Sequence, residues 1–253
     1  MGFRYIDEIA SKENLAKFLE FVDLAIGSGQ DVNNAFDLSE KFHDTRPMEL
    51  CIEAIKQDPA SAAMLKEKYV GEPYNLEAML KMPKYSLGWT YARILQTLDL
   101  DANFYRTPKT FNSEAEYITY RVFRTHDIHH ILTGFSLDVF GESGVISLSV
   151  AQFHYPGFLF IDLTSLLMRF IASPSLYSES LEKTEQVKTL GYGFKVIQMG
   201  IEMGESAKKL FPIKFEEHLE RPLDDIRQEL NIIPVTEGPY SWYSDPALKA
   251  AIA

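Results

Sequence analysis

The chain has 253 residues, 46% of them hydrophobic and 24% charged, which is the composition of a globular protein with a buried core. Its 25 Lys and Arg against 36 Asp and Glu leave a formal charge of -11. This balance argues against nucleic-acid binding, because such proteins neutralise phosphates with clustered basic side chains. The single cysteine, Cys51, rules out an intramolecular disulfide, and no stretch has the roughly 18 to 20 uncharged apolar residues of a membrane span.

The N-terminal residues predict a cytoplasmic protein. Residues 1–10 contain acidic side chains and lack an apolar stretch. They match neither a secretory signal nor an Arg- and Ser-rich transit peptide. We therefore expect a bacterial-type protein that remains in the cytoplasm.

Helical signals dominate the first hundred residues. Apolar residues at three- and four-residue spacing predict an amphipathic helix over 15–26, which the glycines of 27–29 end. Pro47 and Pro59 each precede a periodic run, and proline suits a helix start because the N–H that it lacks is unpaired there in any case. A further short helix is predicted over 86–98.

The clearest helix signal lies in the middle of the chain. Ser113 and Glu116 have the spacing of a capping box, and the helix that they begin is expected to end at Gly134. The apolar residues 142–172 follow, and Tyr-Pro-Gly at 155–157 divides them into two predicted helices.

The rest of the chain is also expected to be helical. Residues 175–211 are periodic and contain several glycines, which indicates close helix packing or a dimer interface. Residues 214–230 are expected to form a charged helix that Pro222 interrupts or restarts. Strand-like alternation occurs at 145–150, where we expect helix to prevail.

These elements predict an all-α protein, built as a single-domain multi-helix bundle over residues 1–253. The loop over 99–111 is the best candidate for a domain boundary, but it is short. We expect residues 1–80 to form an N-terminal helical layer that packs on the remainder.

Three side chains of the central predicted helix can converge on one point. At about 100° per residue, Asp127 lies about 100° and His130 about 40° from His126, so that the three share one helix face. Two histidines four residues apart offer two nitrogens to a divalent ion, and Glu142, at the start of the next helix, can add a carboxylate. Such a mixed site suits Zn, Fe or Mn, whereas the alternative is a His-Asp pair that only forms hydrogen bonds within the fold.

Three neighbouring side chains are weaker candidates. His129 falls outside the shared face, which makes it the least suitable of the three histidines as a ligand. Arg121 and Arg124 point away from that face and could bind an anionic substrate only from a neighbouring groove. Pairing with a nearby acid, such as Glu114 or Glu116, is the alternative for each arginine.

The segment 156–172 is apolar nearly all round but contains Asp162 and Arg169. A central core helix accounts for this composition. The alternatives are a wall for a long hydrocarbon ligand and a membrane-docking surface.

Most other catalytic classes fit poorly. The sequence has no Gly-x-Ser-x-Gly elbow, no Walker loop and no Gly-x-Gly-x-x-Gly after a strand. An HD-type metal-dependent phosphohydrolase would combine His126 and Asp127 with a separate upstream histidine. His43 is the sole upstream histidine, and this hydrolase stays as an alternative.

The central motif resembles that of a known family. His126-Asp127-x-x-His130, followed after eleven residues by Glu142, is similar to the H-D-x-x-H-x11-E signature of the fourth protein of coenzyme Q (ubiquinone) biosynthesis. The resemblance implies that these four residues bind a divalent metal, usually taken as zinc, with magnesium, iron or manganese as alternatives.

The flanking sequence resembles the same family. Segments 86–92, 132–134 and 220–232 agree with it, so that the likeness covers about residues 82–232. It implies an all-helical core with a hydrophobic groove for an isoprenoid tail, which the apolar helices around 145–172 would supply.

The resemblance also implies a function. Members of this family are held to remove the ring C1 carboxylate of a polyprenylated hydroxybenzoate oxidatively. Our leading hypothesis assigns this reaction to the chain, with a proton relay at Asp127 or His129 and substrate binding at Arg121 and Arg124. The alternative is a non-catalytic scaffold or carrier that holds the prenylated lipid.

The resemblance finally implies partners. Family members associate with other quinone-biosynthesis enzymes and lie peripherally on a membrane, and we expect a homodimer. Because membranes are commonly anionic, the charge of -11 predicts docking through an exposed apolar helix or through partner proteins.

Overall fold

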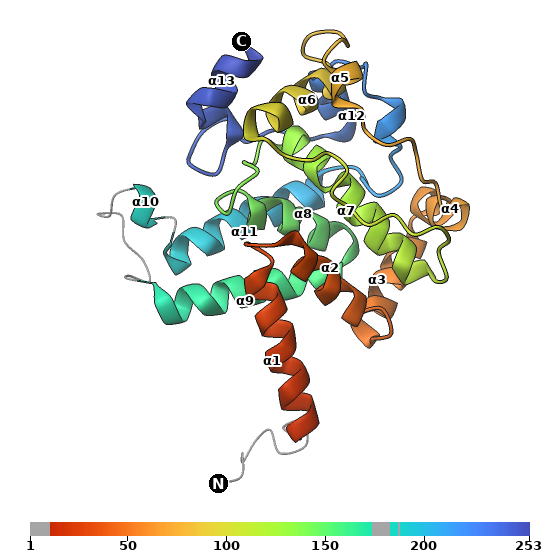
Figure 1. Ribbon diagram of the computed structural model, residues 1–253, viewed down its shortest axis with the longest axis vertical. Helices are drawn as coiled ribbons and strands as arrows, with labels where there is room; N and C mark the ends of the chain where they lie inside the picture. The colour runs from red at the N-terminus through yellow and green to blue at the C-terminus, as the bar shows by residue number, and fades with distance from the viewer. Residues whose placement is uncertain (1–10, 174–182, 187) are drawn as a thin grey trace.

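The computed structural model describes residues 11–173, 183–186 and 188–253 (Figure 1). Within these residues the chain forms α-helices, short 3-10 turns and two isolated bridges, Ser86 to Pro222 and Phe135 to Ser241, without a β-strand. The all-α prediction is confirmed. The α-helices are α1 (Lys12–Gly27), α2 (Val32–Lys41), α3 (Arg46–Gln57), α4 (Pro59–Glu67), α5 (Leu76–Met79), α6 (Leu87–Leu98), α7 (Glu114–Thr133), α8 (Glu142–Phe153), α9 (Pro156–Ala172), α10 (Lys183–Gln186), α11 (Leu190–Ser206), α12 (Leu223–Leu230) and α13 (Pro246–Ile252).

Two predictions fall wholly or partly on residues that the structure does not describe. The cytoplasmic address rests on residues 1–10, which lie outside the described residues. The periodic segment 175–211 begins among residues 174–182, which are also outside them, and its described part contains α10 and α11.

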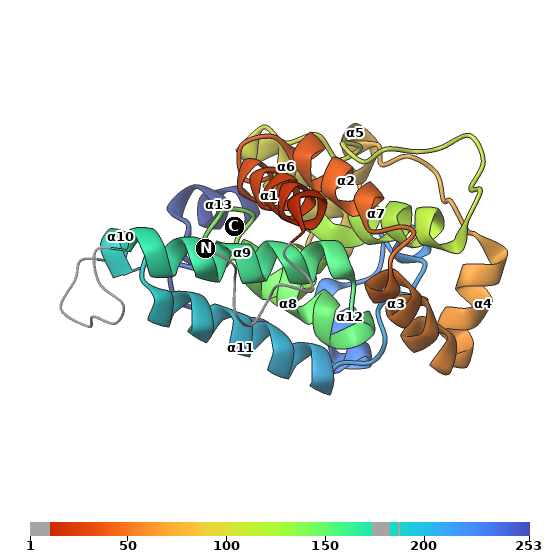
Figure 2. The same cartoon turned by 90° about the horizontal axis from the view of Figure 1, so that it is seen from below.

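Helix α7 lies at the centre of the fold (Figure 1, Figure 2). The Ser113 hydroxyl accepts a hydrogen bond of 3.1 Å from the Glu116 N–H, as the capping-box spacing predicts, and the Glu116 carboxylate accepts one from the Asn112 N–H. Helices α2, α3, α4, α6 and α8 surround it, and nearly all its side chains are buried. A helix surrounded in this way directs its histidines at protein groups instead of bulk water.

Glycines allow α8 and α11 to pack at close range. A Cβ at Gly200 would overlap the Gly144 carbonyl oxygen, and one at Gly204 would lie 2.7 Å from the Leu148 carbonyl oxygen. Close helix packing and a dimer interface were the two uses expected for these glycines. Gly200 and Gly204 both serve close helix packing within the chain. This contact fixes the position of α8, which begins at Glu142.

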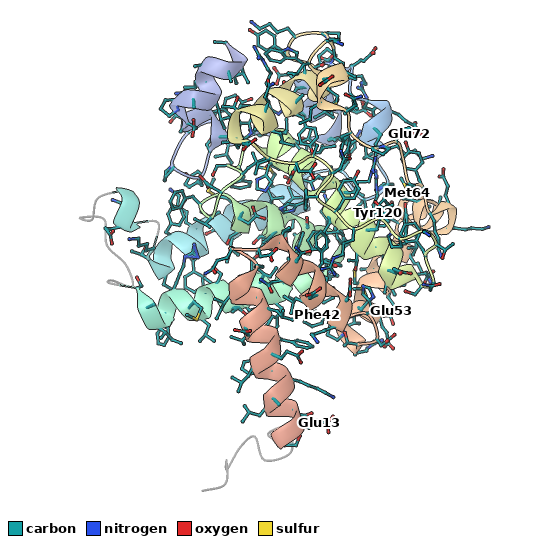
Figure 3. The ribbon with its side chains drawn as sticks, viewed as in Figure 1. Glu13, Phe42, Glu53, Met64, Glu72 and Tyr120 are labelled. Atoms are coloured by element: carbon teal, nitrogen blue, oxygen red, sulfur yellow. The ribbon has the colours of Figure 1, made fainter. Side chains whose placement is uncertain are left out.

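Helices α1 and α9 form a lower layer. Figure 2 shows α9 between α1 and α11, and Figure 1 shows α1 extending away from the body of the molecule. Phe160 of α9 contacts Phe21 of α1, with ring centroids 5.9 Å apart, and also contacts Phe42, the residue that follows α2, at 5.8 Å. Figure 3 shows Phe42 close to the base of α1 and Glu13 at its outer end.

In the segment 214–230, the prediction that Pro222 restarts a helix is confirmed, but the prediction of a charged helix before Pro222 is wrong. That part contains only a 3-10 turn, η1 (Phe215–Glu217), and α12 begins after Pro222. The carbonyls of Leu219 and Arg221 instead accept hydrogen bonds from Gly88 and Leu87 at the start of α6, at 2.7 and 2.9 Å. A continuous helix would need an N–H of residue 222 to bond to the His218 carbonyl, and Pro222 has none. The Leu223 N–H donates to the Tyr85 carbonyl at 3.0 Å and not to Leu219.

One hydrophobic core extends from Ala35 of α2 to Leu248 of α13. Ala102 and Tyr105, in the loop named as the best candidate for a domain boundary, belong to this core. The apolar core is therefore continuous across this loop and includes helices on either side of it.

Candidate metal centre

The side chains of His126, His130 and Glu142 converge at the end of α7. Their ligand atoms all lie within 4.8 Å of one another. The two histidine Nε2 atoms are 3.3 Å apart, and the Glu142 carboxylate oxygens lie 2.6 Å from His126 Nε2 and 3.2 Å from His130 Nε2. Both imidazoles are buried, whereas 40% of the Glu142 side chain remains exposed.

A short loop returns Glu142 to the helix that carries the histidines. Helix α7 ends at Gly134, whose φ of 82° is in the region that favours glycine. The Asp138 carboxylate then accepts hydrogen bonds from the N–H groups of Phe140 and Gly141, at 2.9 and 3.2 Å. A Cβ at Gly141 would overlap the Ser136 backbone, so this position needs glycine for the chain to turn back so tightly.

Neighbouring groups fix the orientation of His130. Its Nδ1 lies 3.2 Å from the Phe135 carbonyl oxygen, which can only accept, so that Nδ1 carries the proton of the neutral ring. The lone pair is then on Nε2, which faces His126 and Glu142. The indole N–H of Trp242 donates to the His130 carbonyl at 3.0 Å and ties the C-terminal segment to the end of α7.

These three residues fit a divalent ion. A tetrahedral ion with bonds of about 2.1 Å separates its ligand atoms by roughly 3.4 Å, and two of the three pairs here lie at 3.3 and 3.2 Å. The third pair, at 2.6 Å, is a hydrogen bond from His126 Nε2–H to Glu142. His126 Nδ1 is buried and has no hydrogen-bond partner in the described part of the chain. An ion bound at His126 Nε2 would replace the proton that this nitrogen donates to Glu142.

The charges of the cluster stabilise one another. Burial acts against the charged form of Glu142, but His126 and His130 outweigh it and hold the pKa of Glu142 well below its usual range. Burial likewise opposes protonation of His126, and the charge and hydrogen bond of Glu142 nevertheless raise the pKa of His126 above its usual value. The carboxylate is thus ionised and available as a ligand.

Asp127 lies beside the cluster but is not one of the three residues whose ligand atoms converge. Burial raises the pKa of Asp127, while the positive charge that His126 and His130 carry when protonated lowers it. Burial raises the pKa of Tyr91 on α6, and the charge of the nearby Asp127 raises it further. Its place as a fourth ligand stays a prediction.

His129 points toward another part of the core. Its ring packs against Phe215, with centroids 5.8 Å apart, and neither ring nitrogen has a hydrogen-bond partner among the residues that the structure describes. Burial lowers the pKa of His129 to about 3, so the ring is neutral at neutral pH. A proton relay through His129 stays a prediction, and no described hydrogen bond links it to the cluster.

Arg121 and Arg124 are buried against Glu216 of η1. Their guanidinium nitrogens lie 2.7 and 2.6 Å from the same carboxylate oxygen. Arg121 also donates to the Ile213 carbonyl, and Arg124 to Tyr105 and the Glu72 carbonyl. The acid that pairs with them comes from a distant part of the sequence and is neither of the two expected acids of the same helix. Their use in substrate binding stays a prediction.

His43 lies away from the cluster. Its Nε2 is 2.9 Å from the Thr119 hydroxyl, and burial lowers the pKa of His43. The upstream histidine that an HD-type phosphohydrolase would use is therefore bound elsewhere in the fold.

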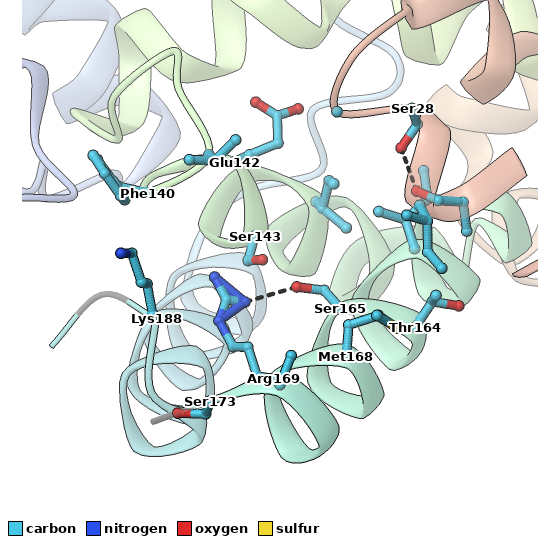
Figure 4. Close-up of a pocket in the computed structure, with 17 residues that line it drawn as sticks. Ser28, Phe140, Glu142, Ser143, Thr164, Ser165, Met168, Arg169, Ser173 and Lys188 are labelled. Carbon is cyan, nitrogen blue, oxygen red and sulfur yellow. Dashed lines mark hydrogen bonds between the residues drawn. The ribbon is translucent and has the colours of Figure 1, made fainter. Parts of the chain in front are cut away.

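A largely apolar cavity of about 640 Å³ adjoins Glu142 (Figure 4). Helices α1, α8 and α9 line it together with the loop before α8 and Lys188. The last turn of α1 is a wall that the sequence did not indicate, because its contact with α9 forms only in the folded chain. Arg169 of α9 also lines the cavity and was not among the predicted site residues. The sequence did mark it, as a charged residue within an apolar helix.

Comparisons with known proteins agree with this fold and motif. A family model described as "Coenzyme Q (ubiquinone) biosynthesis protein Coq4" matches residues 14–236, so the likeness extends well before residue 82. The mitochondrial ubiquinone biosynthesis protein coq4 of Penicillium rubens is 27% identical over 184 residues, which cover 71% of this chain and 59% of that protein. The Mus musculus COQ4 homolog is also 27% identical over 184 residues, 71% of this chain and 63% of that protein. The chain thus matches about three-fifths of the length of these relatives.

A solved structure has the same fold. The crystal structure of a protein from Nostoc punctiforme, provisionally assigned to ubiquinone biosynthesis, superimposes with a TM-score of 0.71. The superposition covers 87% of this chain and 98% of that chain, at 24% sequence identity. This likeness supports the arrangement of the helices.

Proposed function

Because this chain belongs to the coenzyme Q (ubiquinone) biosynthesis protein Coq4 family, we propose that it acts in ubiquinone biosynthesis as a metal-dependent enzyme. Its substrate is a polyprenylated hydroxybenzoate, and its reaction is oxidative removal of the carboxylate at ring C1. The observation that carries the proposal is the position of Glu142, which belongs to the His126, His130 and Glu142 cluster and also lines the apolar cavity.

Each residue of the cluster has a part in this reaction. His126, His130 and Glu142 would hold the ion, with Asp127 as a further ligand or as a proton carrier. A bound divalent ion, zinc in the first instance, supplies Lewis acidity. The Phe135 carbonyl keeps the proton of His130 on Nδ1, and the raised pKa of Asp127 favours a carboxyl group that can donate a proton.

The overall change replaces one ring bond by another. The bond from ring C1 to the carboxyl carbon breaks, carbon dioxide leaves, and an oxygen atom bonds to C1 as a hydroxyl. With dioxygen as the oxygen donor, two electrons and two protons from a reductant convert the second oxygen atom to water. The cavity would hold the ring and the first isoprene units, because its lining is largely apolar.

We also propose that the protein docks peripherally on a membrane, next to other quinone-biosynthesis proteins. In the described part of the chain, none of the helices has the length and apolar character to cross a bilayer. Large apolar side chains are nevertheless exposed on two of the three helices that line the cavity: Leu15, Phe18, Leu19 and Ile26 on α1, and Leu159, Leu163, Leu167, Phe170 and Ile171 on α9. Docking on this surface would let a prenyl tail pass from the bilayer into the cavity. A homodimer stays a prediction.

A scaffold or carrier of prenylated lipid is the second candidate, because an apolar cavity alone suffices for lipid binding. The two functions differ in turnover. The purified protein is incubated with metal, oxygen, a reductant and a prenylated hydroxybenzoate that carries ¹⁴C in its carboxyl group. An enzyme releases labelled carbon dioxide, and His130→Asn abolishes the release, whereas a carrier binds the lipid and returns it unchanged.

A further inference from the structure

Arg169 lines the cavity from the last turn of α9 (Figure 4). Its Nη1 donates a hydrogen bond of 2.7 Å to the Ser165 hydroxyl one turn earlier. Its Nε is buried and has no partner among the residues that the structure describes. Within the same residues, no carboxylate forms an ion pair with it.

The acidic groups that lie near Arg169 among the described residues do not form an ion pair with it. Asp162 accepts a hydrogen bond of 2.6 Å from Ser147, and burial raises the pKa of Asp162 to about 7. Tyr192 keeps its proton, because burial raises the pKa of its hydroxyl, and this hydroxyl donates to the Phe140 carbonyl at 3.2 Å. A guanidinium remains charged even though burial lowers its pKa. The cavity wall therefore contains a cation that pairs with no carboxylate of the described residues.

Helix α11 holds this cation in place. A Cβ at Gly193 would lie 3.0 Å from Arg169 Cδ and 3.4 Å from Nε, so the glycine makes room for the arginine stem between α9 and α11. Figure 4 shows the guanidinium directed toward Ser165, with Ser143 of α8 nearby. A constrained guanidinium needs little ordering before it forms paired hydrogen bonds to a planar oxyanion.

The other cation of the lining is already paired. Lys188 lies 2.8 Å from Glu185 and is largely exposed. The two arginines that the sequence suggested for substrate binding, Arg121 and Arg124, share Glu216 in the core. Arg169 is thus the guanidinium that is both free of a carboxylate, among the described residues, and open to the cavity.

We propose that Arg169 binds the carboxylate of the substrate and orients the aromatic ring in the cavity. Binding of this carboxylate would compensate a cation that burial otherwise leaves unpaired. The apolar lining contacts the ring and tail, and Glu142 places the metal cluster at the same cavity. This inference rests on the proposed function, because that function supplies an aromatic acid as the ligand.

Binding of two ligands tests the inference. Calorimetric titration compares a farnesylated hydroxybenzoate with its methyl ester, which has the same ring and tail but no charge. Wild type should bind the acid more tightly than the ester. Arg169→Gln should weaken binding of the acid by about tenfold to 100-fold, the usual effect of losing a charged hydrogen-bonded contact, and leave the ester unchanged.

Two further variants complete the design. Arg169→Lys retains the charge and should restore part of the preference for the acid. Arg46→Gln makes the same change at an exposed arginine on α3 and should bind both ligands as wild type does. Metal content should be the same in all of them, since Arg169 is not among the converging ligands.

The outcomes separate this inference from the proposed function. Equal affinity of wild type for acid and ester, or an equal loss of both in Arg169→Gln, overturns the role of Arg169. If the preference depends on Arg169 but no carbon dioxide is released, the binding site stands and the proposed reaction fails. If carbon dioxide is released while the acid-to-ester ratio ignores Arg169, the reverse holds.

Discussion

The Nε2 atoms of His126 and His130 lie 3.3 Å apart on successive turns of α7, and the Nδ1 proton of His130 is held by the Phe135 carbonyl. Phe135, which lies beyond the end of the helix, therefore determines which nitrogen of His130 is free. The same loop then brings Glu142 to within 2.6 Å of His126. The cluster depends on the helix, on its glycine end and on the turn that follows.

His130→Asn should remove metal from the protein. The variant loses the Nε2 ligand, so metal affinity should fall by more than about 100-fold, beyond the effect of losing an outer hydrogen-bond partner. Elemental analysis of the folded protein measures the loss. His154→Asn is the matched control, since His154 is exposed and asparagine tolerates its φ of 59°. Unchanged metal in His130→Asn would exclude the site.

Glu216→Ala should destabilise the fold strongly. It leaves Arg121 and Arg124 buried without their anion, and breaking a buried ion pair in this way costs about 3 to 5 kcal/mol of unfolding free energy. Urea denaturation gives the value. Glu67→Ala breaks the exposed pair with Lys214 and should cost less than about 1 kcal/mol. Similar losses in the two variants would contradict this account of the arginines.

Asp162→Asn should change how stability depends on pH. Burial raises the pKa of Asp162 from 3.8 to about 7, so the folded state prefers the protonated form. The stability that this preference contributes is complete below pH 3.8 and is lost as the pH rises through about 7. Asparagine stays neutral, and the variant should therefore gain roughly 1 to 3 kcal/mol on wild type between pH 5 and pH 8.

Urea denaturation of wild type and Asp162→Asn at both pH values measures this difference. Asp23→Asn changes an exposed residue of α1 and should show no such gain. A stability difference that is the same at pH 5 and pH 8 would show that Asp162 is ionised in the folded protein at both.

Gly200→Ala should separate α8 from α11. The added Cβ would overlap the Gly144 carbonyl, and overpacking of this kind costs about 1 to 3 kcal/mol or more. Thermal unfolding reports the loss. Gly29→Ala is the control, because the nearest atom to its Cβ would be 4.0 Å away. Equal melting temperatures for the two variants would mean that the helices do not approach as closely as described.

Leu163→Glu combined with Phe170→Glu should weaken membrane docking. Both side chains are exposed on α9, and their loss from the bilayer should reduce co-flotation with phosphatidylcholine vesicles by about tenfold or more. Ile233→Glu is the control, because Ile233 is 83% exposed and belongs to neither α1 nor α9. Vesicle binding that is unchanged, together with loss of a dimer in sedimentation, would assign this surface to self-association instead.

Local patterns predicted most of the helices. Ser113 and Gly134 mark the ends of α7 as expected, and Pro156 begins α9 where the apolar segment was expected to divide. These signals work because capping and proline effects act within a few residues. The segment 214–230 differs because the carbonyls of Leu219 and Arg221 pair with α6, and no local pattern contains that contact.

The candidate site shows the same division. The spacing of His126 and His130 on one helix follows from helix geometry, and the glycines around the loop indicated how Glu142 could return to them. The spacing also placed Asp127 on the shared face, and its place as a fourth ligand stays a prediction, because its carboxylate is not among the three groups that converge.

The sequence by itself determined the helical class, the ends of the central helix and a pair of histidines one turn apart, because these depend on hydrogen bonds between residues a few positions apart. Only the tertiary structure decided that Glu216 forms ion pairs with Arg121 and Arg124. It also decided that α1 and α9 help to enclose a cavity with Arg169 in its wall. Burial and pairing of charges depend on which distant segments pack together, and that choice is made by the whole core at once.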